Sequence, residues 1–142
     1  MNILAGTPAF PQAEGFGKFS QGGRGGQVLF VTTLLDNPDD KTKIPGSLRT
    51  AIETKGPRTI IFRVSGNISL RRPLKISEPF ITIAGQSAPG AGICLQNYSL
   101  LILTHDVIIR HLRIRPGDII GLSKKEEGID WETDALCITN KA

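Results

Sequence analysis

The chain has 142 residues, of which 39% are apolar and 21% charged, so it can form one domain with a buried core. This composition excludes an intrinsically disordered chain, and the lack of any apolar run of about 18 residues argues against a membrane-spanning helix. The net charge of +4 suits either an ordinary basic surface or attraction for a polyanion. The Lys and Arg residues are scattered, and with one Tyr and one Trp the chain shows no aromatic platform on which nucleic-acid bases could stack. An acidic polysaccharide suits the same positive charge.

The N-terminal segment is rich in glycine and small residues. It lacks a basic stretch followed by a long apolar one, so it is not a complete signal peptide. The sequence GGRGG at residues 22–26 has no Lys-Ser/Thr after it and precedes a strand, which argues against a phosphate-binding loop. We expect these glycines to lie against another backbone, where a Cβ would not fit.

A single short helix is predicted before the main run of strands. A strand is predicted over 28–34 and a polar loop over 36–45. Ser47 is suited to be an N-cap, residues 48, 51 and 52 form one apolar face, and Gly56 is a C-terminal stop. One amphipathic helix ahead of stacked strands indicates a plug over the exposed end of a repeat core.

Residues 59–115 form a series of short β-branched runs with turn residues between them. Apolar residues alternate within each run, as in Ile81 and Ile83, which predicts strands with one buried face. We place bends at Asn67 and Asn97, among other turn residues. The spacing between runs varies and the chain has no Asn-Gly or Asp-Gly hairpin turn, so a right-handed parallel β-helix fits better than a sandwich.

After Arg115 the pattern changes. Residues 116–133 read as a polar loop with charges of both signs, and a strand follows from Ala135. The two cysteines, Cys94 and Cys137, lie in apolar runs and are interpreted as buried free thiols; a disulfide is possible, and the redox compartment stays undetermined.

Several local signatures now coincide in order and spacing: GFG, GGRGG, VTTL, PGSLRTAI, IIFRVSGNISL, ITIAGQSAPGAGI, VIIRHLRIRPGD and DALCI. Together they resemble the bacterial pectate lyase family of polysaccharide lyases. The resemblance implies a right-handed parallel β-helix with a short N-terminal capping helix, incomplete at its C-terminus. It implies one domain over 1–142, with the cap at about 1–58 and the first coils at about 59–142.

For function, the resemblance implies Ca²⁺-dependent β-elimination on polygalacturonate or pectin, in which an Arg base removes a proton next to a uronate carboxylate. It also implies secretion, an acidic polysaccharide as the partner, no nucleic acid or membrane partner, and a monomer. The family's catalytic Arg has no counterpart here and is expected beyond residue 142, so this chain alone is expected to have little or no activity.

The family's acidic pair beside the Ca²⁺ site matches Glu132 and Asp134, which directly precede a strand. Asp134 matches better, and Glu132 departs from the pattern if the family residue is Asp. In an extended segment, residues two apart point to the same side, so both carboxylates can face one groove. The alternative is that both are solvated loop acids.

The nearby basic residues are not given catalytic roles. Arg113 and Arg115 alternate with apolar residues and should point outward, as a solvated face or as uronate contacts. No role is transferred to Arg110, and His105 and His111 are interpreted as structural because neither has the spacing of a zinc site.

Two other functions stay open: a non-catalytic β-helix domain that binds polysaccharide or acts as a scaffold, and a β-helix pectin hydrolase. The second would need clustered Asp residues on a strand, which the sequence does not show.

Overall fold

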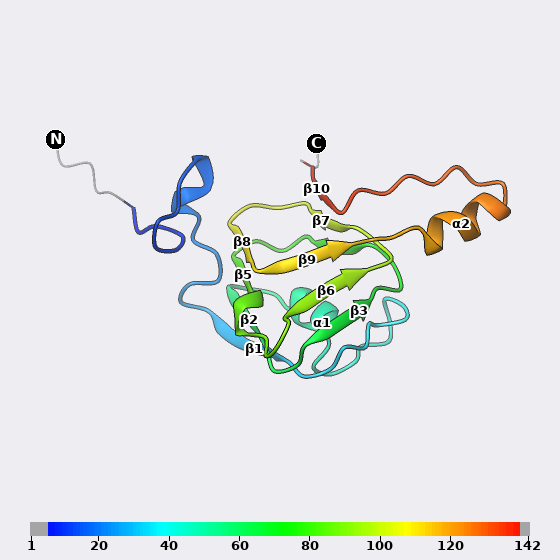
Figure 1. Cartoon of the computed structure of the whole chain (residues 1–142). Coiled ribbons are helices and arrows are strands. Elements are labelled where there is room, and N and C mark those ends of the chain that lie inside the picture. Colours follow the sequence, from blue (N-terminus) through cyan, green and yellow to red (C-terminus); the bar gives the residue numbers. More distant parts are fainter. Residues whose placement is uncertain (1–5, 140–142) are drawn as a thin grey trace.

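The computed structural model describes residues 6–139, which form a stack of short strands (Figure 1). The strands of this part of the chain belong to three sheets, and all strand pairs are parallel. From residue 58 onward, consecutive strands lie in different sheets, so this part of the chain passes through each sheet once per coil. Because crossovers between parallel strands are right-handed, this is the right-handed parallel β-helix that the sequence predicts.

Each sheet runs along the stack, and the first has one more strand than either of the other two. The first sheet holds β1 (Gln27–Val31), β2 (Arg58–Phe62), β5 (Ile81–Ala84) and β8 (Val107–Arg110). The second holds β3 (Gly66–Ser69), β6 (Ile93–Gln96) and β9 (Leu112–Arg115). The third holds β4 (Leu74–Ile76), β7 (Leu100–Ile102) and β10 (Leu136–Ile138).

Apolar side chains of successive coils stack on one another inside the three sheets. Ile60 pairs with Ile83 in the first sheet, and Ile68 pairs with Leu95 in the second. All four are at most 1% exposed, as the alternating pattern predicts. Burying one such side chain stabilises the fold by about 1.5–3 kcal/mol relative to leaving it in water. In the last coil, by contrast, Ile138 is 74% exposed.

Two boundary predictions need correction. The strand expected over 28–34 is β1, which ends at Val31. Asn67 was expected at a bend but lies within β3, because its backbone pairs with Cys94 of β6. Asn97 does lie at a bend, where its φ of 77° takes the left-handed conformation that Asn tolerates better than most residues.

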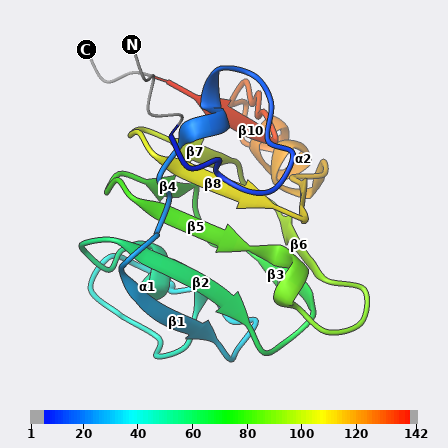
Figure 2. The ribbon, with the colours of Figure 1, turned by 90° about the vertical axis from the view of Figure 1, so that its left-hand side faces the viewer.

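The predicted capping helix is α1 (Leu48–Ile52), which lies at the β1 end of the stack (Figure 2). The Ser47 hydroxyl accepts a hydrogen bond from the Thr50 N–H at 3.2 Å, which confirms the predicted N-cap. Leu48, Ala51 and Ile52 are buried in the core, so the helix closes that end. The helix ends at Ile52, and Gly56 lies beyond it in the turn toward β2.

A buried ion pair joins α1 to the loop before it. The Arg49 guanidinium donates from Nε and Nη2 to the two carboxylate oxygens of Asp36, both at 2.7 Å, and both side chains are 1% exposed. Arg49 also donates to the carbonyls of Arg72 and Pro73, and Asp36 accepts from the Arg71 N–H. The pair thus fixes α1, the loop over 32–46 and the turn before β4 against one another.

A second buried arginine, Arg58, has no carboxylate partner within hydrogen-bonding distance among residues 6–139. Arg58 is fully buried and donates to the carbonyls of Ile52, Gly56, Glu78 and Pro79. Burial lowers the pKa of Arg58, since the charged form loses its hydration. The carbonyl contacts connect the end of α1 to the turn of the next coil.

The glycine-rich segment belongs to an N-terminal arm, residues 6–26, that runs along the first sheet from β1 toward β8 (Figure 2). This arm includes the 3₁₀ turn η1 (Phe16–Phe19), and a second 3₁₀ turn, η2 (Gly85–Ser87), follows β5. A Cβ at Gly23 would overlap the Arg58 carbonyl, and one at Gly26 would overlap the Pro57 carbonyl, so the predicted close backbone approach is confirmed. The Gln21 N–H donates to Asp106 at 2.7 Å, which lowers the pKa of Asp106.

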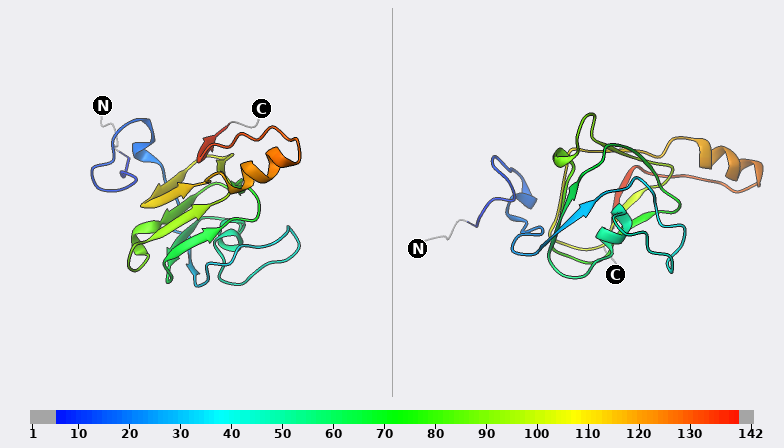
Figure 3. Two further views of the ribbon diagram at one scale, coloured as in Figure 1. Left: turned by 45° about the vertical axis from the view of Figure 1, so that its right-hand side comes forward. Right: turned by 90° about the horizontal axis from the view of Figure 1, so that it is seen from below.

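The interpretation of 116–133 as a polar loop is wrong in part, because this segment contains α2 (Ile119–Glu126). The helix projects away from the stack (Figure 3) and has no buried residue. It ends in a Schellman motif, in which the Ile129 N–H donates to the Lys124 carbonyl and the Gly128 N–H to the Lys125 carbonyl. Among residues 6–139, no helix has the length and apolarity that a bilayer crossing requires.

Replacing Asp36 by Ala should leave Arg49 buried without its counter-ion. We expect the free energy of unfolding to fall by about 3–5 kcal/mol. Asp40 is the matched control, because it also pairs with an arginine at 2.7 Å but is 86% exposed. Asp40→Ala should cost about 1 kcal/mol or less. Urea denaturation followed by circular dichroism gives both values, and equal losses would contradict the role of the buried pair.

Replacing Gly23 by Ala should push the N-terminal arm away from β2. The Cβ would overlap the Arg58 carbonyl, so we expect a loss of about 1–3 kcal/mol in the free energy of unfolding. Gly17→Ala is the control, since a Cβ there meets nothing within 4 Å. Thermal unfolding of both variants measures the difference. A Gly23→Ala protein as stable as Gly17→Ala would rule out the close approach.

Candidate metal and saccharide site

The α2 loop, residues 116–135, connects β9 to β10 and stands beside the third sheet. In the preceding coil the same corner, between β6 and β7, takes only residues 97–99. The longer connection therefore forms a projection of its own on the side of the stack. It carries both of the acids that the sequence analysis selected, Glu132 and Asp134.

Glu132 and Asp134 lie in an extended segment that leads into β10. Both are exposed, whereas Trp131, which precedes Glu132, and Thr133, which lies between the two acids, are half-buried. The two carboxylates therefore share the outer side of the segment. This alternation is the one expected for residues two apart in an extended chain. The metal-binding role of the two residues stays a prediction.

Ser99, which is 8% exposed, holds this segment against the stack. Its hydroxyl lies 2.7 Å from the Thr133 hydroxyl and donates to the Asp134 carbonyl. The Leu100 N–H then donates to the Ala135 carbonyl at 3.1 Å, where the pairing of β10 with β7 begins. The backbone on which the two carboxylates sit is thus fixed from one side by β7 and the residue before it.

The donor chemistry suits Ca²⁺, which prefers oxygen ligands and takes six to eight of them. Two carboxylates supply at most four oxygens. Among residues 6–139, no group of three or more His, Cys, Asp or Glu side chains is placed to hold a metal ion. The pair can therefore form one edge of a calcium site but needs further oxygen ligands to complete it.

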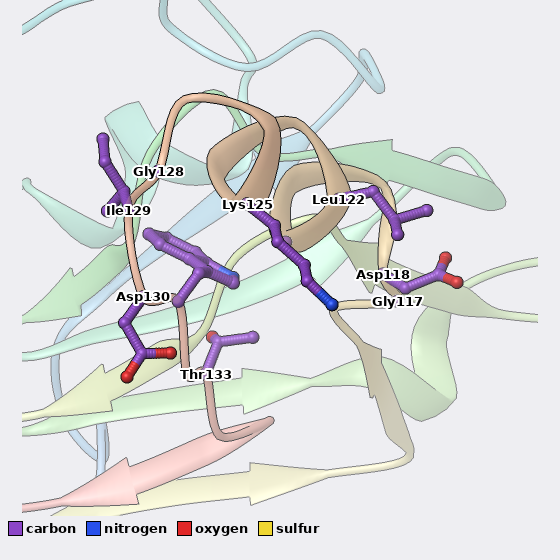
Figure 4. A pocket seen from close by; sticks show the side chains of 10 residues that line it. Gly117, Asp118, Leu122, Lys125, Gly128, Ile129, Asp130 and Thr133 are labelled. Atoms are coloured by element: carbon purple, nitrogen blue, oxygen red, sulfur yellow. The ribbon is translucent and has the colours of Figure 1, made fainter.

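A pocket of about 670 Å³ lies between α2 and the segment that returns to β10 (Figure 4). Figure 4 shows Lys125 extending from α2 across this pocket, with Asp118 and Asp130 on opposite sides of it. The Trp131 indole also lines the pocket and contacts the edge of the Tyr98 ring, with 5.8 Å between ring centroids. The pocket thus combines one aromatic wall with several charged groups.

The α2 loop is acidic although the chain is basic. Residues 117–134 contain two lysines and six acidic residues, a net charge of −4; the whole chain carries +4, so the remainder carries +8. One of the lysines is already paired, since Lys124 donates to Glu127 at 2.9 Å, which raises the pKa of Lys124. The loop therefore attracts cations, and the body of the protein attracts polyanions.

The basic residues near the last coil have the orientations expected. Arg113 and Arg115 are exposed on β9, and Arg113 donates to the Ala91 carbonyl at 2.6 Å. Arg110 lies over the Phe10 ring of the N-terminal arm, 4.4 Å from its centroid. A uronate contact by Arg113 or Arg115 stays a prediction.

The two histidines and two cysteines lie outside the pocket. His105 pairs with Asp106 at 2.9 Å, and His111 takes a positive φ of 53° at the bend between β8 and β9. Cys94 and Cys137 are free; Cys94 is buried as expected, whereas Cys137 is only half-buried.

The sequence pattern does not predict the pocket, because it indicates an irregular loop over this segment. Two signals were present. Gly128 follows a run containing Lys124 and Lys125, as at a helix C-terminus, and Asp118 stands at the position of an N-cap. The single tryptophan, Trp131, follows directly and lines the pocket.

Comparison with known sequences gives consistent relatives. No protein-family model matches the chain. A probable pectate lyase C from Emericella nidulans is 42% identical over 110 residues, which cover 77% of this chain and 24% of that protein. A probable pectate lyase C from Aspergillus flavus is 41% identical over 130 residues, covering 91% and 29%. A probable pectate lyase 6 from Arabidopsis thaliana is 33% identical over 84% of this chain and 27% of that protein.

Among solved structures, the chain is similar to Jun a 1, the major allergen from cedar pollen. The match has a TM-score of 0.57 and 36% sequence identity, and it covers 70% of this chain and 28% of that one. The chain therefore spans 24–29% of the length of the proteins that it resembles.

Replacing Ser99 by Ala should loosen the segment that carries Glu132 and Asp134. We expect a loss of about 0.5–1.5 kcal/mol in stability and faster amide hydrogen exchange over residues 131–135. Ser123→Ala, on the exposed side of α2, should change neither quantity. Hydrogen exchange with mass spectrometry measures both variants, and unchanged exchange in Ser99→Ala would refute the anchoring role.

Proposed function

Since this chain belongs to the pectate lyase family, we propose that it is the N-terminal part of a Ca²⁺-dependent lyase that cleaves polygalacturonate by β-elimination. The single observation that carries this assignment beyond the family is the acidic pair. Glu132 and Asp134 share one exposed side of a segment anchored by Ser99, at the start of the last strand.

In this proposal, the chain supplies the cap, the first coils and one edge of the metal site. Glu132 and Asp134 donate carboxylate oxygens, and the substrate's uronate, water and acids on further coils complete the coordination. Bound Ca²⁺ would withdraw charge from the uronate carboxylate and so acidify the neighbouring C–H. The base, an Arg in this family, comes from a coil beyond residue 142.

The last coil supports the proposal that further coils stack on it. Leu136 and Ile138 of β10 are 45% and 74% exposed, whereas their partners Leu100 and Ile102 on β7 are 0% and 8% exposed. A further parallel strand at this edge would bury the same apolar face. The basic body of the protein, at +8, favours association with an acidic polysaccharide in the extracellular space.

A second candidate is a non-catalytic domain that binds acidic polysaccharide. The charge of +8 outside the α2 loop favours it, because that charge attracts an acidic polymer without any catalytic group. The two candidates differ in product: a lyase leaves an unsaturated sugar end, and a binding domain leaves the polymer intact.

Calcium titration of the chain tests the acidic pair. With polygalacturonate present, we expect Ca²⁺ binding with an apparent Kd on the order of 10⁻⁴–10⁻³ M. Asp134→Asn and Glu132→Gln should each weaken it at least about tenfold, because each removes one of two protein carboxylates. Asp40→Asn, which alters an exposed carboxylate in the loop before α1, should leave it unchanged. Calcium binding that is unaffected by either site variant would reject the site.

The ultraviolet absorbance of unsaturated product, with Ca²⁺ or with chelator, tests the assignment of the base. We expect no turnover from the 142-residue chain, since the Arg that serves as the base in this family has no counterpart in it. Ca²⁺-dependent turnover by this chain would show that its base lies within residues 1–142. New reducing ends without unsaturated product would instead indicate a hydrolase.

A further inference from the structure

We propose that the pocket between α2 and the returning segment binds an uncharged sugar residue of a pectic chain. The neutral residue is either a methyl-esterified uronyl unit or a neutral sugar, and both share the chemistry of hydroxyl groups without a free carboxylate. The inference rests on the proposed function and deepens it, because it assigns to the α2 loop a choice between neutral and acidic units.

The size and lining of the pocket suit a sugar ring. Its volume of about 670 Å³ falls within the range of roughly 300–1,000 Å³ that is typical of small-molecule sites. Leu122, Ile129 and Trp131 provide apolar surface for the C–H face of a ring. Asp118 and Asp130 can accept hydrogen bonds from hydroxyl groups, and the Lys125 ammonium can donate to them.

Trp131 has a donor that the described residues leave unused. Its indole nitrogen is buried and has no hydrogen-bond partner within residues 6–139. The same edge of the ring faces Gly121, since a Cβ there would lie 3.1 Å from Trp131 Cδ1 and 3.8 Å from Nε1. The N–H edge therefore packs against the α2 backbone at Gly121 and is closed to a ligand, so Trp131 contributes apolar ring surface to the pocket.

The charges of the pocket select against a free uronate. Two carboxylates, Asp118 and Asp130, line it against one ammonium group, Lys125. The neighbouring Lys124 is engaged by Glu127, and the loop as a whole carries −4. A uronate carboxylate in the pocket would meet net negative charge, whereas esterification removes that charge and adds a methyl group suited to the apolar wall.

The position of the pocket relates it to the proposed calcium site. Trp131 and Thr133 line the pocket, and Glu132 and Asp134 on the same extended segment do not. One segment thus presents carboxylates on one side and a sugar pocket on the other.

The fluorescence of Trp131 tests the proposal directly, because it is the only tryptophan in the chain. The 142-residue protein is titrated, in chelator, with methyl-esterified oligogalacturonate, unesterified oligogalacturonate and a neutral galacto-oligosaccharide. We expect the esterified ligand to shift the Trp131 emission at a concentration at least about tenfold lower than the unesterified one. A response to the galacto-oligosaccharide would extend the site to neutral sugars, and its absence would assign the site to the ester.

Two variants with matched controls separate the pocket from general effects of the loop. Gly121→Ile should fill the pocket and abolish the response, whereas Ser123→Ile on the exposed part of α2 should preserve it. Asp118→Asn should reduce the preference for the ester at least about threefold, because it removes a lining carboxylate. Glu126→Gln makes the same change of charge outside the pocket and should leave the preference intact. If Gly121→Ile unfolds the loop, as its circular dichroism would show, the comparison of Asp118→Asn with Glu126→Gln still tests the proposal.

The proposal is overturned if the unesterified ligand binds as tightly as the esterified one at low ionic strength. It is also overturned if no ligand alters Trp131 emission at millimolar concentration. Chelator keeps this outcome separate from the proposed function. Ca²⁺-dependent binding of polygalacturonate without any Trp131 response would reject the sugar site and leave the lyase proposal standing. A Trp131 response without Ca²⁺ binding would support the sugar site and count against the calcium site.

Discussion

Each coil of this protein has an apolar inner face that only its neighbours in the stack can bury. The parallel register meets this need by placing like residues above one another, as with Ile60 and Ile83. A slip of one residue would turn every inward side chain outward, so the register is strongly specified. The register also fixes where the acidic segment lies, because the pairing of Leu136 with Leu100 sets the position of Asp134 two residues earlier.

The first coil has no neighbour on one side, and α1 supplies the missing surface. Its apolar face closes the core, while two buried arginines hold it in place. Arg49 is neutralised by Asp36, whereas the hydrogen bonds of Arg58 within the described part of the chain all go to backbone carbonyls. Such charges are costly to bury and become tolerable only when nearly every donor is satisfied. The geometry of the cap is therefore specific, because few arrangements satisfy both guanidinium groups.

The sequence predicted those features that depend on local patterns. The alternation of apolar and polar residues predicted the strands, Ser47 predicted the start of α1, and the glycines of the N-terminal arm indicated close backbone contact. It did not predict the backbone carbonyls that accept hydrogen bonds from Arg58. Two of them belong to Glu78 and Pro79, which are 20 and 21 positions further along the chain. It also missed α2, because that helix buries no residue and so has no strong apolar stripe; only its ends carry a signal, and the Schellman motif at Gly128 was the clearer one. The acidic pair was found through the family's motif, and its spacing alone would have left it among other loop acids.

The α2 loop can vary because the stack does not depend on it. Lengthening a surface connection costs little closure entropy, so a corner that takes three residues in one coil can take about twenty in the next. What such an insertion lacks is rigidity, and here the stack supplies it at one point. Ser99 and the start of β7 hold residues 133–135, so Glu132 and Asp134 gain a fixed backbone while α2 stays free of the core. The charge follows the same division, because the insertion is acidic and the rest of the chain is basic.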